Sequence, residues 1–179
     1  FILGLLLFTL ITPAYRSWLT SRKSLIALVI MLAVFAPNLF WNFESGWVTF
    51  THVKDNTNLK GDLFHVGKML EFVGSQAGVF GPVLFAALLW RLALLRRDPA
   101  AQTEKLLLCF CLPVLLIISG QSFRSRATAN WAATAYVPAT ILVVSWLLQR
   151  GRLKLVATGV GINLAAAAVL GFFFLDLPG

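Results

Sequence analysis

The sequence predicts an all-α fold, a polytopic bundle of about six transmembrane helices, and two observations lead to this fold class. Hydrophobic residues make up 59% of the chain and charged residues 12%, and the mean hydropathy is +0.83. A soluble domain carries roughly twice that share of charged residues. The apolar residues also form long continuous runs without strict alternation, which favours helices over the strands of a membrane barrel.

Six runs contain no charged residue, and each predicts one membrane-crossing segment. In chain order they are 1–15, 24–43, 72–90, 106–123, 127–149 and 155–175. A hydrocarbon core about 30 Å thick needs roughly 20 mostly apolar helical residues, a length that the last five runs meet or approach. The first run is short, so we expect a truncated helix and a chain, 1–179, that is a single transmembrane domain and a piece of a longer protein.

The connections between the runs predict the orientation of the bundle. Alternate connections hold ten basic residues against only Asp98 and Glu104, whereas the other connections and the C-terminus balance five basic residues with five acidic ones. By the positive-inside rule the basic connections are cytoplasmic, and the external side carries a long loop, 41–74, and a second loop, 121–130. Topology therefore accounts for most of the net charge of +8, and no nucleic acid is expected as a partner.

The long external loop holds both histidines of the chain and several aromatic residues. Phe43, Trp47 and Phe50 are spaced as on one helical face, which predicts a short amphipathic helix over 41–53 lying in the membrane interface. Such a helix either anchors the bundle alone or also forms one wall of a ligand cavity. His52 and Asp55 lie one helical turn apart, but their spacing matches no zinc signature, so no metal is expected.

The second external loop carries two arginines between two apolar runs. Arg124 and Arg126, with nearby serines, Asn130 and Trp131, form a candidate oxyanion site. A guanidinium group suits phosphate because its donors form a planar fork and its charge does not titrate away. The alternative is that both arginines only anchor the bundle by reaching the headgroup layer.

Two stretches resemble a known family. The segments APNLFWNFESGWVTFTHVKDN, from residue 36, and HVGKMLEFVGSQAGVFGPVLF, from residue 65, are similar to the middle of bacterial membrane glycosyltransferases of the dolichyl-phosphate-mannose protein mannosyltransferase type. These form family 39 of the GT-C superfamily, which includes the lipid A aminoarabinose transferase. SFRSRATANWAATAY, from residue 122, resembles their later segment, although Ala129 and Ala132 stand where proline is common.

The resemblance implies transfer of a sugar from a polyprenyl-phosphate donor to an acceptor on the external face of the bacterial inner membrane. It implies no cofactor, and no part of this chain matches the family's acidic loop, so the catalytic residues are not assigned. The donor phosphate is assigned to Arg124, Arg126 and Asn130. The cavity and the loop over it are assigned to His52, Asp55, Asn56, His65, Glu71, Gln76, Trp131 and Tyr136.

Two other functions remain open from the sequence: a transporter or flippase for a lipid-linked anion, and a structural membrane subunit. Transporters carry ionisable residues within their spans and broken helices near the midplane. The apolar runs hold no charged residue, although Pro82, Pro113 and Pro138 can kink helices. The absence of intramembrane charge favours the transferase.

Overall fold

A computed structural model describes residues 2–48, 51, 66–124 and 128–175. These residues contain α-helices and short 3-10 helices and no strand, which confirms the all-α prediction. The elements are α1 (Ile2–Ile11), the 3-10 helix η1 (Pro13–Thr20), α2 (Arg22–Glu44), α4 (Val66–Phe80), α5 (Pro82–Leu94), α6 (Gln102–Arg124), the 3-10 helix η2 (Ala129–Ala132), α7 (Ala133–Gln149) and α8 (Leu153–Leu175).

Four helical segments in the described part of the chain are long and apolar enough to cross a membrane, namely α2, α6, η2 with α7, and α8. The pair α4 and α5 makes a fifth if it counts as one broken span, and α1 is apolar but has only 10 residues. The chain is therefore an integral membrane protein of four or five long apolar spans, while the expectation of six crossings stays a prediction.

The run 72–90 is not the continuous span that its hydropathy predicts. It is divided between α4 and α5, and the chain bends by 116° between these two helices. Gly81 stands at the break with a φ of 92°, in a region that L side chains rarely adopt, and Pro82 follows as the first residue of α5. The carbonyl of Phe80 accepts a hydrogen bond of 3.2 Å from Asn163 Nδ2 on α8, so a polar side chain from another span satisfies this carbonyl.

The helix predicted over 41–53 is also interrupted. The span α2 continues to Glu44, and Ser45–Trp47 form a turn in which Gly46 and Trp47 have φ values of 66° and 60°. The amide of Trp47 donates to the carbonyl of Asn42 at 2.7 Å, which caps the end of α2. Phe43 and Trp47 therefore do not share one helical face, and helical structure resumes only at Val48.

Helical structure extends into both predicted external loops, whose location outside the membrane stays a prediction. Residues 41–44 and 66–74 of the first belong to α2 and α4, and α6 extends through Arg124 in the second. The reason is that α-helices end where their hydrogen bonding is interrupted, and a charged or polar residue beyond the apolar run does not by itself interrupt it.

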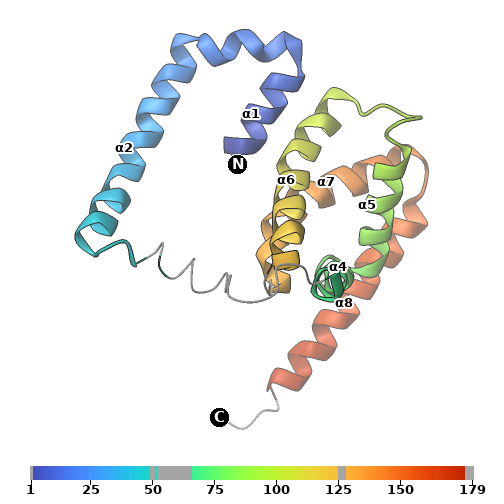
Figure 1. Cartoon of the computed structure of the whole chain (residues 1–179). Coiled ribbons are helices and arrows are strands. Elements are labelled where there is room, and N and C mark those ends of the chain that lie inside the picture. The colour runs from blue at the N-terminus through green and yellow to red at the C-terminus, as the bar shows by residue number, and fades with distance from the viewer. Residues whose placement is uncertain (1, 49–50, 52–65, 125–127, 176–179) are drawn as a thin grey trace.

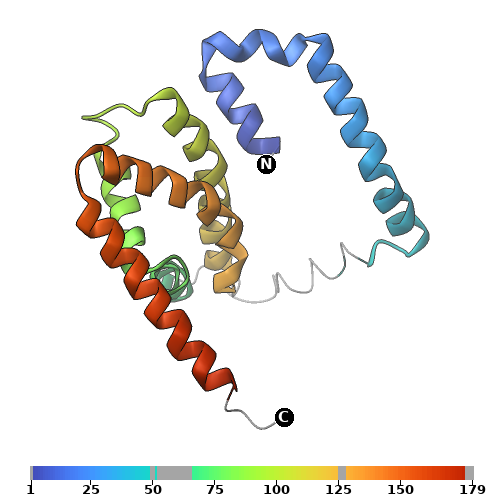
Figure 2. The ribbon, with the colours of Figure 1, turned by 180° about the vertical axis from the view of Figure 1, so that it is seen from behind.

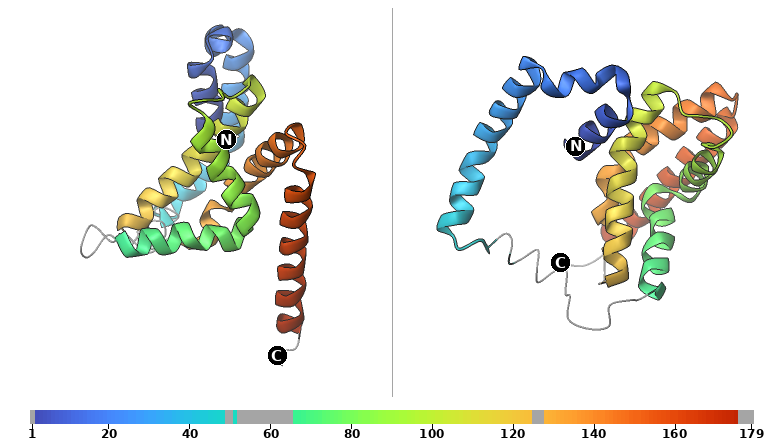
Figure 3. Two further views of the ribbon diagram at one scale, coloured as in Figure 1. Left: turned by 90° about the vertical axis from the view of Figure 1, so that its right-hand side faces the viewer. Right: turned by 45° about the horizontal axis from the view of Figure 1, so that its top comes forward.

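Helix α7 lies at the centre of the bundle and α2 at its margin. Half of the apolar window of α7 is buried, compared with none of that of α2. Figure 1 shows α2 joined to the rest through η1 and standing apart from α6 and α7, and Figure 2 shows the same arrangement from behind. In Figure 3, left, α5 and α7 lie between α6 and α8, and both contact α8.

The two ends of the bundle differ. The connections that follow α1, α5 and α7, where most of the basic residues gather, lie toward the upper end in Figure 1. Helix α4 lies across the opposite end: it is seen nearly end-on in Figure 1 and lengthwise in Figure 3, left. Its buried residues Phe72, Gln76 and Phe80 recur every four positions and face the bundle.

Candidate functional site

A buried hydrogen bond joins α4 to α7 at the end opposite the basic connections. Tyr136 Oη donates to Gln76 Oε1, and Gln76 Nε2 donates to the carbonyl of Phe72 at 2.9 Å. The ring of Tyr136 stacks on Phe80, with 4.5 Å between centroids and 13° between planes. Gln76 is 2% exposed and Tyr136 7%. The structure thus brings together two of the residues that the sequence assigned to the cavity.

This pair has a structural consequence that needs no ligand. A buried amide or hydroxyl is costly unless it is hydrogen-bonded, and here each group satisfies the other. Because the bond joins residues 60 positions apart, it fixes α4 against α7 and keeps α4 across the end of the bundle.

The other predicted site residues are less closely placed. Glu71 is exposed on α4, Asn130 is exposed in η2, and Trp131 is partly buried beside it. Arg124 is the last residue of α6, but its side chain is not among those that the structure describes. The remaining predictions fall on positions outside the described residues: His52, Asp55, Asn56, His65 and Arg126.

The phosphate site and the metal expectation therefore stay predictions. The described part of the chain contains no group of three or more potential metal ligands, and this does not bear on His52 and His65. The two described elements that flank the arginine segment, α6, which ends at Arg124, and η2, which begins at Ala129, both contact α4.

An open groove of about 460 Å³ runs beside the break between α4 and α5. Three of its lining residues are polar, and two of these donate to backbone carbonyls: Asn163 to Phe80, and Thr140 Oγ1 to Tyr136 at 2.7 Å. The third polar residue is Tyr136. The remaining lining residues are apolar: Val79, Phe80, Leu84, Ala133, Val137, Val160 and Leu164. Such a lining suits a hydrocarbon chain better than a sugar or a phosphate.

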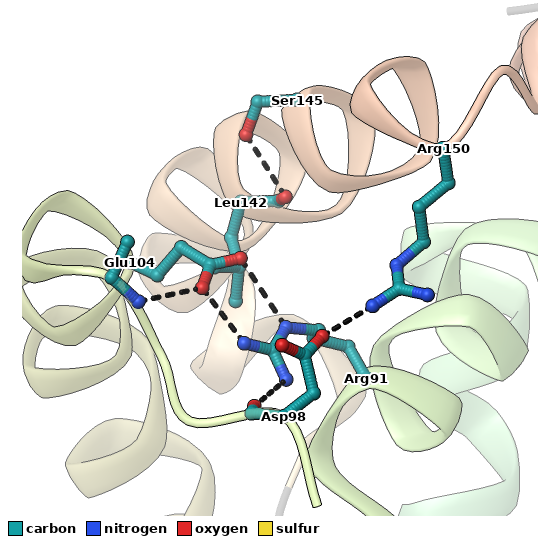
Figure 4. Close-up of polar contacts among 7 residues, drawn as sticks. Arg91, Asp98, Glu104, Leu142, Ser145 and Arg150 are labelled. Carbon is teal, nitrogen blue, oxygen red and sulfur yellow. Dashed lines mark hydrogen bonds and ion pairs between the residues drawn. The ribbon is translucent and has the colours of Figure 1, made fainter. Parts of the chain in front are cut away.

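Sequence reasoning missed a charged cluster at the other end of the bundle. Arg91 is 1% exposed, and its guanidinium binds Glu104 through two nitrogens, with Nη2 2.7 Å from Oε2 and Nε 3.2 Å from Oε1. Its third nitrogen, Nη1, donates to the carbonyl of Asp98 at 3.0 Å (Figure 4). Glu104 Oε2 also accepts from the amide of Ala101 at 3.0 Å, which caps the start of α6.

A second ion pair lies next to the first. Arg150 Nη2 binds Asp98 Oδ2, and both side chains are close to half exposed (Figure 4). The ring of Trp146 contacts the guanidinium carbons of Arg91 and Arg150 at 5.8 and 5.0 Å from its centroid. These cation–π contacts and the two ion pairs hold the ends of α5, α6 and α7 together.

One signal in the sequence could have identified Arg91. Leu84, Ala87, Leu88 and Arg91 are the buried residues of α5 and follow the spacing of one helical face. An arginine in register with an apolar stripe indicates a buried charge, and a buried charge requires a partner.

A comparison with known proteins identifies a relative for most of the chain. The chain is 36% identical over 174 residues to the lipid A galacturonosyltransferase RgtD of Rhizobium johnstonii, and the match covers 94% of the chain and 36% of that protein. The chain therefore spans about a third of the length of the curated relative that it matches. No family model matches the chain, and no solved structure is detectably similar to it. The chain is thus similar to one part of a protein that is named as a lipid A galacturonosyltransferase.

Proposed function

We propose that this chain is part of a membrane glycosyltransferase that moves a sugar from a polyprenyl-phosphate donor to a lipid acceptor on the external face of the bacterial inner membrane. The observation that carries the proposal is the 36% identity to a lipid A galacturonosyltransferase over 94% of the chain. The name of that relative suggests lipid A as the acceptor and an acidic sugar as the transferred group. The polyprenyl-phosphate donor comes from the family resemblance of the segments around 36–85 and 122–136.

The architecture supports such a donor. A polyprenyl-phosphate sugar has a hydrocarbon tail in the bilayer and a charged head at its edge, so its site must join an apolar surface to cations. The apolar groove lies beside the α4–α5 break, and the segment of Arg124 and Arg126 connects two elements that contact α4. Fixed cations aimed at the phosphate that leaves the sugar lower the barrier of the transfer, because negative charge develops there.

The direct test is the lipid A of a bacterium that makes a polyprenyl-phosphate sugar. We expect the full-length natural protein, expressed in such a host, to add the mass of one sugar residue to lipid A, as seen by mass spectrometry. Unmodified lipid A in a host that makes the donor contradicts the transferase proposal. Translocation of labelled donor across membrane vesicles without transfer would support the flippase instead.

The arginines provide the residue-level test. Arg124→Ala and Arg126→Ala each remove a charge-assisted phosphate contact worth about 1.5–3 kcal/mol, so transfer at subsaturating donor should fall about ten- to a hundredfold. Lysine should recover only part of the activity, because it keeps the charge but loses the fork. Arg22→Ala, at the first residue of α2, is the matched control and should retain activity. Full activity of both alanine variants at normal expression would show that these arginines only anchor the bundle.

The orientation is tested separately from the chemistry. Glu44→Cys at the end of α2 and Ala101→Cys before α6 are exposed positions in regions predicted to face opposite sides. In a background without Cys109 and Cys111, a membrane-impermeant maleimide should label only position 44 in intact spheroplasts, and both positions after permeabilisation. Labelling of position 101 alone in intact spheroplasts contradicts the proposed orientation.

A further inference from the structure

The tertiary structure brings the connection 95–101 against the turn between α7 and α8. Arg150 pairs with Asp98, and the guanidinium of Arg152 lies over the ring of Trp90, 5.9 Å from its centroid. Gly151, with a φ of 67°, permits the tight turn between the two helices, in which the amide of Arg152 donates to the carbonyl of Leu147 at 2.9 Å. We call the exposed cations of these two connections the basic corner: Arg96, Arg97, Arg150 and Arg152.

The basic corner carries more positive charge than its own acids neutralise. Glu104 is committed to the buried Arg91, and Asp98 to Arg150. Within the described residues, Arg96, Arg97 and Arg152 form no ion pair. Three exposed guanidinium groups are thus available for an anion.

The surroundings indicate where that anion comes from. The basic corner joins the ends of membrane helices, so it lies at the level of the lipid headgroups. Trp90 is 40% exposed beside Arg152, as expected of an interfacial aromatic residue. Leu89 and Leu153, the chain neighbours of Trp90 and Arg152, are 50% and 64% exposed, which provides an apolar flank for acyl chains.

We propose that the basic corner binds the phosphodiester headgroup of an anionic glycerophospholipid of the leaflet in which it lies. A guanidinium fork matches two phosphate oxygens, and the tryptophan and leucines accommodate the glycerol and the start of the acyl chains. A soluble anion or a nucleic acid would make no use of this apolar flank. The proposal is independent of the donor phosphate site, because that site lies at the opposite end of the bundle and involves other arginines.

The test measures lipid binding to the full-length natural protein in detergent by native mass spectrometry. Dioleoylphosphatidylglycerol should bind more tightly than dioleoylphosphatidylcholine. Arg152→Gln should weaken phosphatidylglycerol binding about fivefold, and Arg97→Gln with Arg152→Gln about 25-fold, from the usual contribution of each basic residue at an anionic surface. The matched control is Arg22→Gln with Lys23→Gln, which removes the same charge from exposed positions at the start of α2 and should change the affinity less than about twofold.

Three outcomes would overturn the proposal. The first is an equal loss in the control, because it would show diffuse attraction without a site. The second is equal binding of the two lipids by the natural protein. The third is displacement of phosphatidylglycerol by an equal concentration of glycerol phosphate, which would indicate a soluble anion. If the double glutamine variant does not fold, Arg152→Lys replaces it, and an unchanged affinity of that variant contradicts the guanidinium fork.

Discussion

Each end of the bundle contains a polar side chain buried on the apolar face of a helix, but the partners of these two side chains differ. Arg91 on α5 is 1% exposed, and Gln76 on α4 is 2% exposed. Arg91 is paired with the carboxylate of Glu104, at the start of the next helix, whereas Gln76 is bonded to the neutral hydroxyl of Tyr136 on α7.

The difference shows how charge limits the arrangement of a membrane bundle. Moving a charge out of water costs several kcal/mol even after relaxation, so Arg91 needs an opposite charge and lies near the end of its helix. A neutral amide costs less and needs only one or two hydrogen bonds, so Gln76 can join helices in the middle of an apolar contact. Breaking the charged contact should therefore lower the stability of the protein far more than breaking the neutral one.

The largest effect is expected for Glu104→Leu. It leaves the guanidinium of Arg91 buried without its partner, a change that typically costs about 3–5 kcal/mol. We expect a strong loss of thermal stability of the full-length protein, measured by size-exclusion chromatography of heated samples. The double variant Arg91→Leu with Glu104→Leu should recover most of the loss. A double variant as unstable as Glu104→Leu alone contradicts this account of the charged end.

The second largest loss of stability is expected for Gly81→Ala, at the break between α4 and α5. The φ of 92° is unfavourable for alanine by about 1–3 kcal/mol, and a Cβ at this position would lie 2.0 Å from Asn163 Oδ1. Gly78→Ala in α4 is the matched control, since its Cβ would meet open space and alanine favours a helix. Equal melting temperatures of the two variants would show that the break does not depend on Gly81.

Tyr136→Phe tests the neutral end with a smaller change. The phenyl ring keeps the stack on Phe80 but leaves Gln76 Oε1 without its hydroxyl donor, which should cost about 1–2 kcal/mol. Adding Gln76→Met removes the amide whose oxygen has lost this donor and should restore part of the stability. Tyr15→Phe, which deletes an exposed hydroxyl that accepts from Gln102, is the control and should have little effect. A loss in Tyr136→Phe as large as that in Glu104→Leu contradicts the distinction between the two ends.

The smallest effect is expected for Arg150→Gln, which breaks the exposed ion pair beside the buried one. Exposed pairs contribute about 0–1 kcal/mol, and salt screens them. The melting temperature should change little, and the change should shrink further as sodium chloride is raised from low to moderate concentration. A large, salt-independent loss would show that the contact of Arg150 with Trp146 carries more of the stability than the pair with Asp98.

The prolines show that a local sequence signal does not by itself predict where a helix breaks. Pro82, Pro113 and Pro138 can each kink a helix, yet α6 and α7 continue through Pro113 and Pro138. Of these three prolines, only Pro82 lies at a break between two helices. There Gly81 precedes it, and Asn163, which lies 83 residues after Phe80, donates to the carbonyl of Phe80. A proline permits a kink, but the neighbouring residues and the facing helix decide whether the chain turns.

Hydropathy likewise predicts which segments cross the membrane, but it does not predict which of them are buried inside the bundle. The apolar windows of α2 and α7 have mean hydropathies of 2.1 and 1.6, but the share buried inside the bundle is 0% in α2 and 50% in α7. Lipid and protein interior are equally apolar, so hydropathy cannot distinguish a helix that faces lipid from one that packs on its neighbours.

The sequence by itself determined that the chain is all-α, where its long apolar segments lie, and that its basic residues gather in alternate connections. These properties follow from composition summed over about 20 neighbouring residues, a local quantity. Only the tertiary structure decided which polar residues meet: Arg91 with Glu104 across 13 positions, and Gln76 with Tyr136 across 60. A hydrogen bond or an ion pair depends on an approach within a few ångström, and that approach is set by the packing of whole helices rather than by the residues of any one segment.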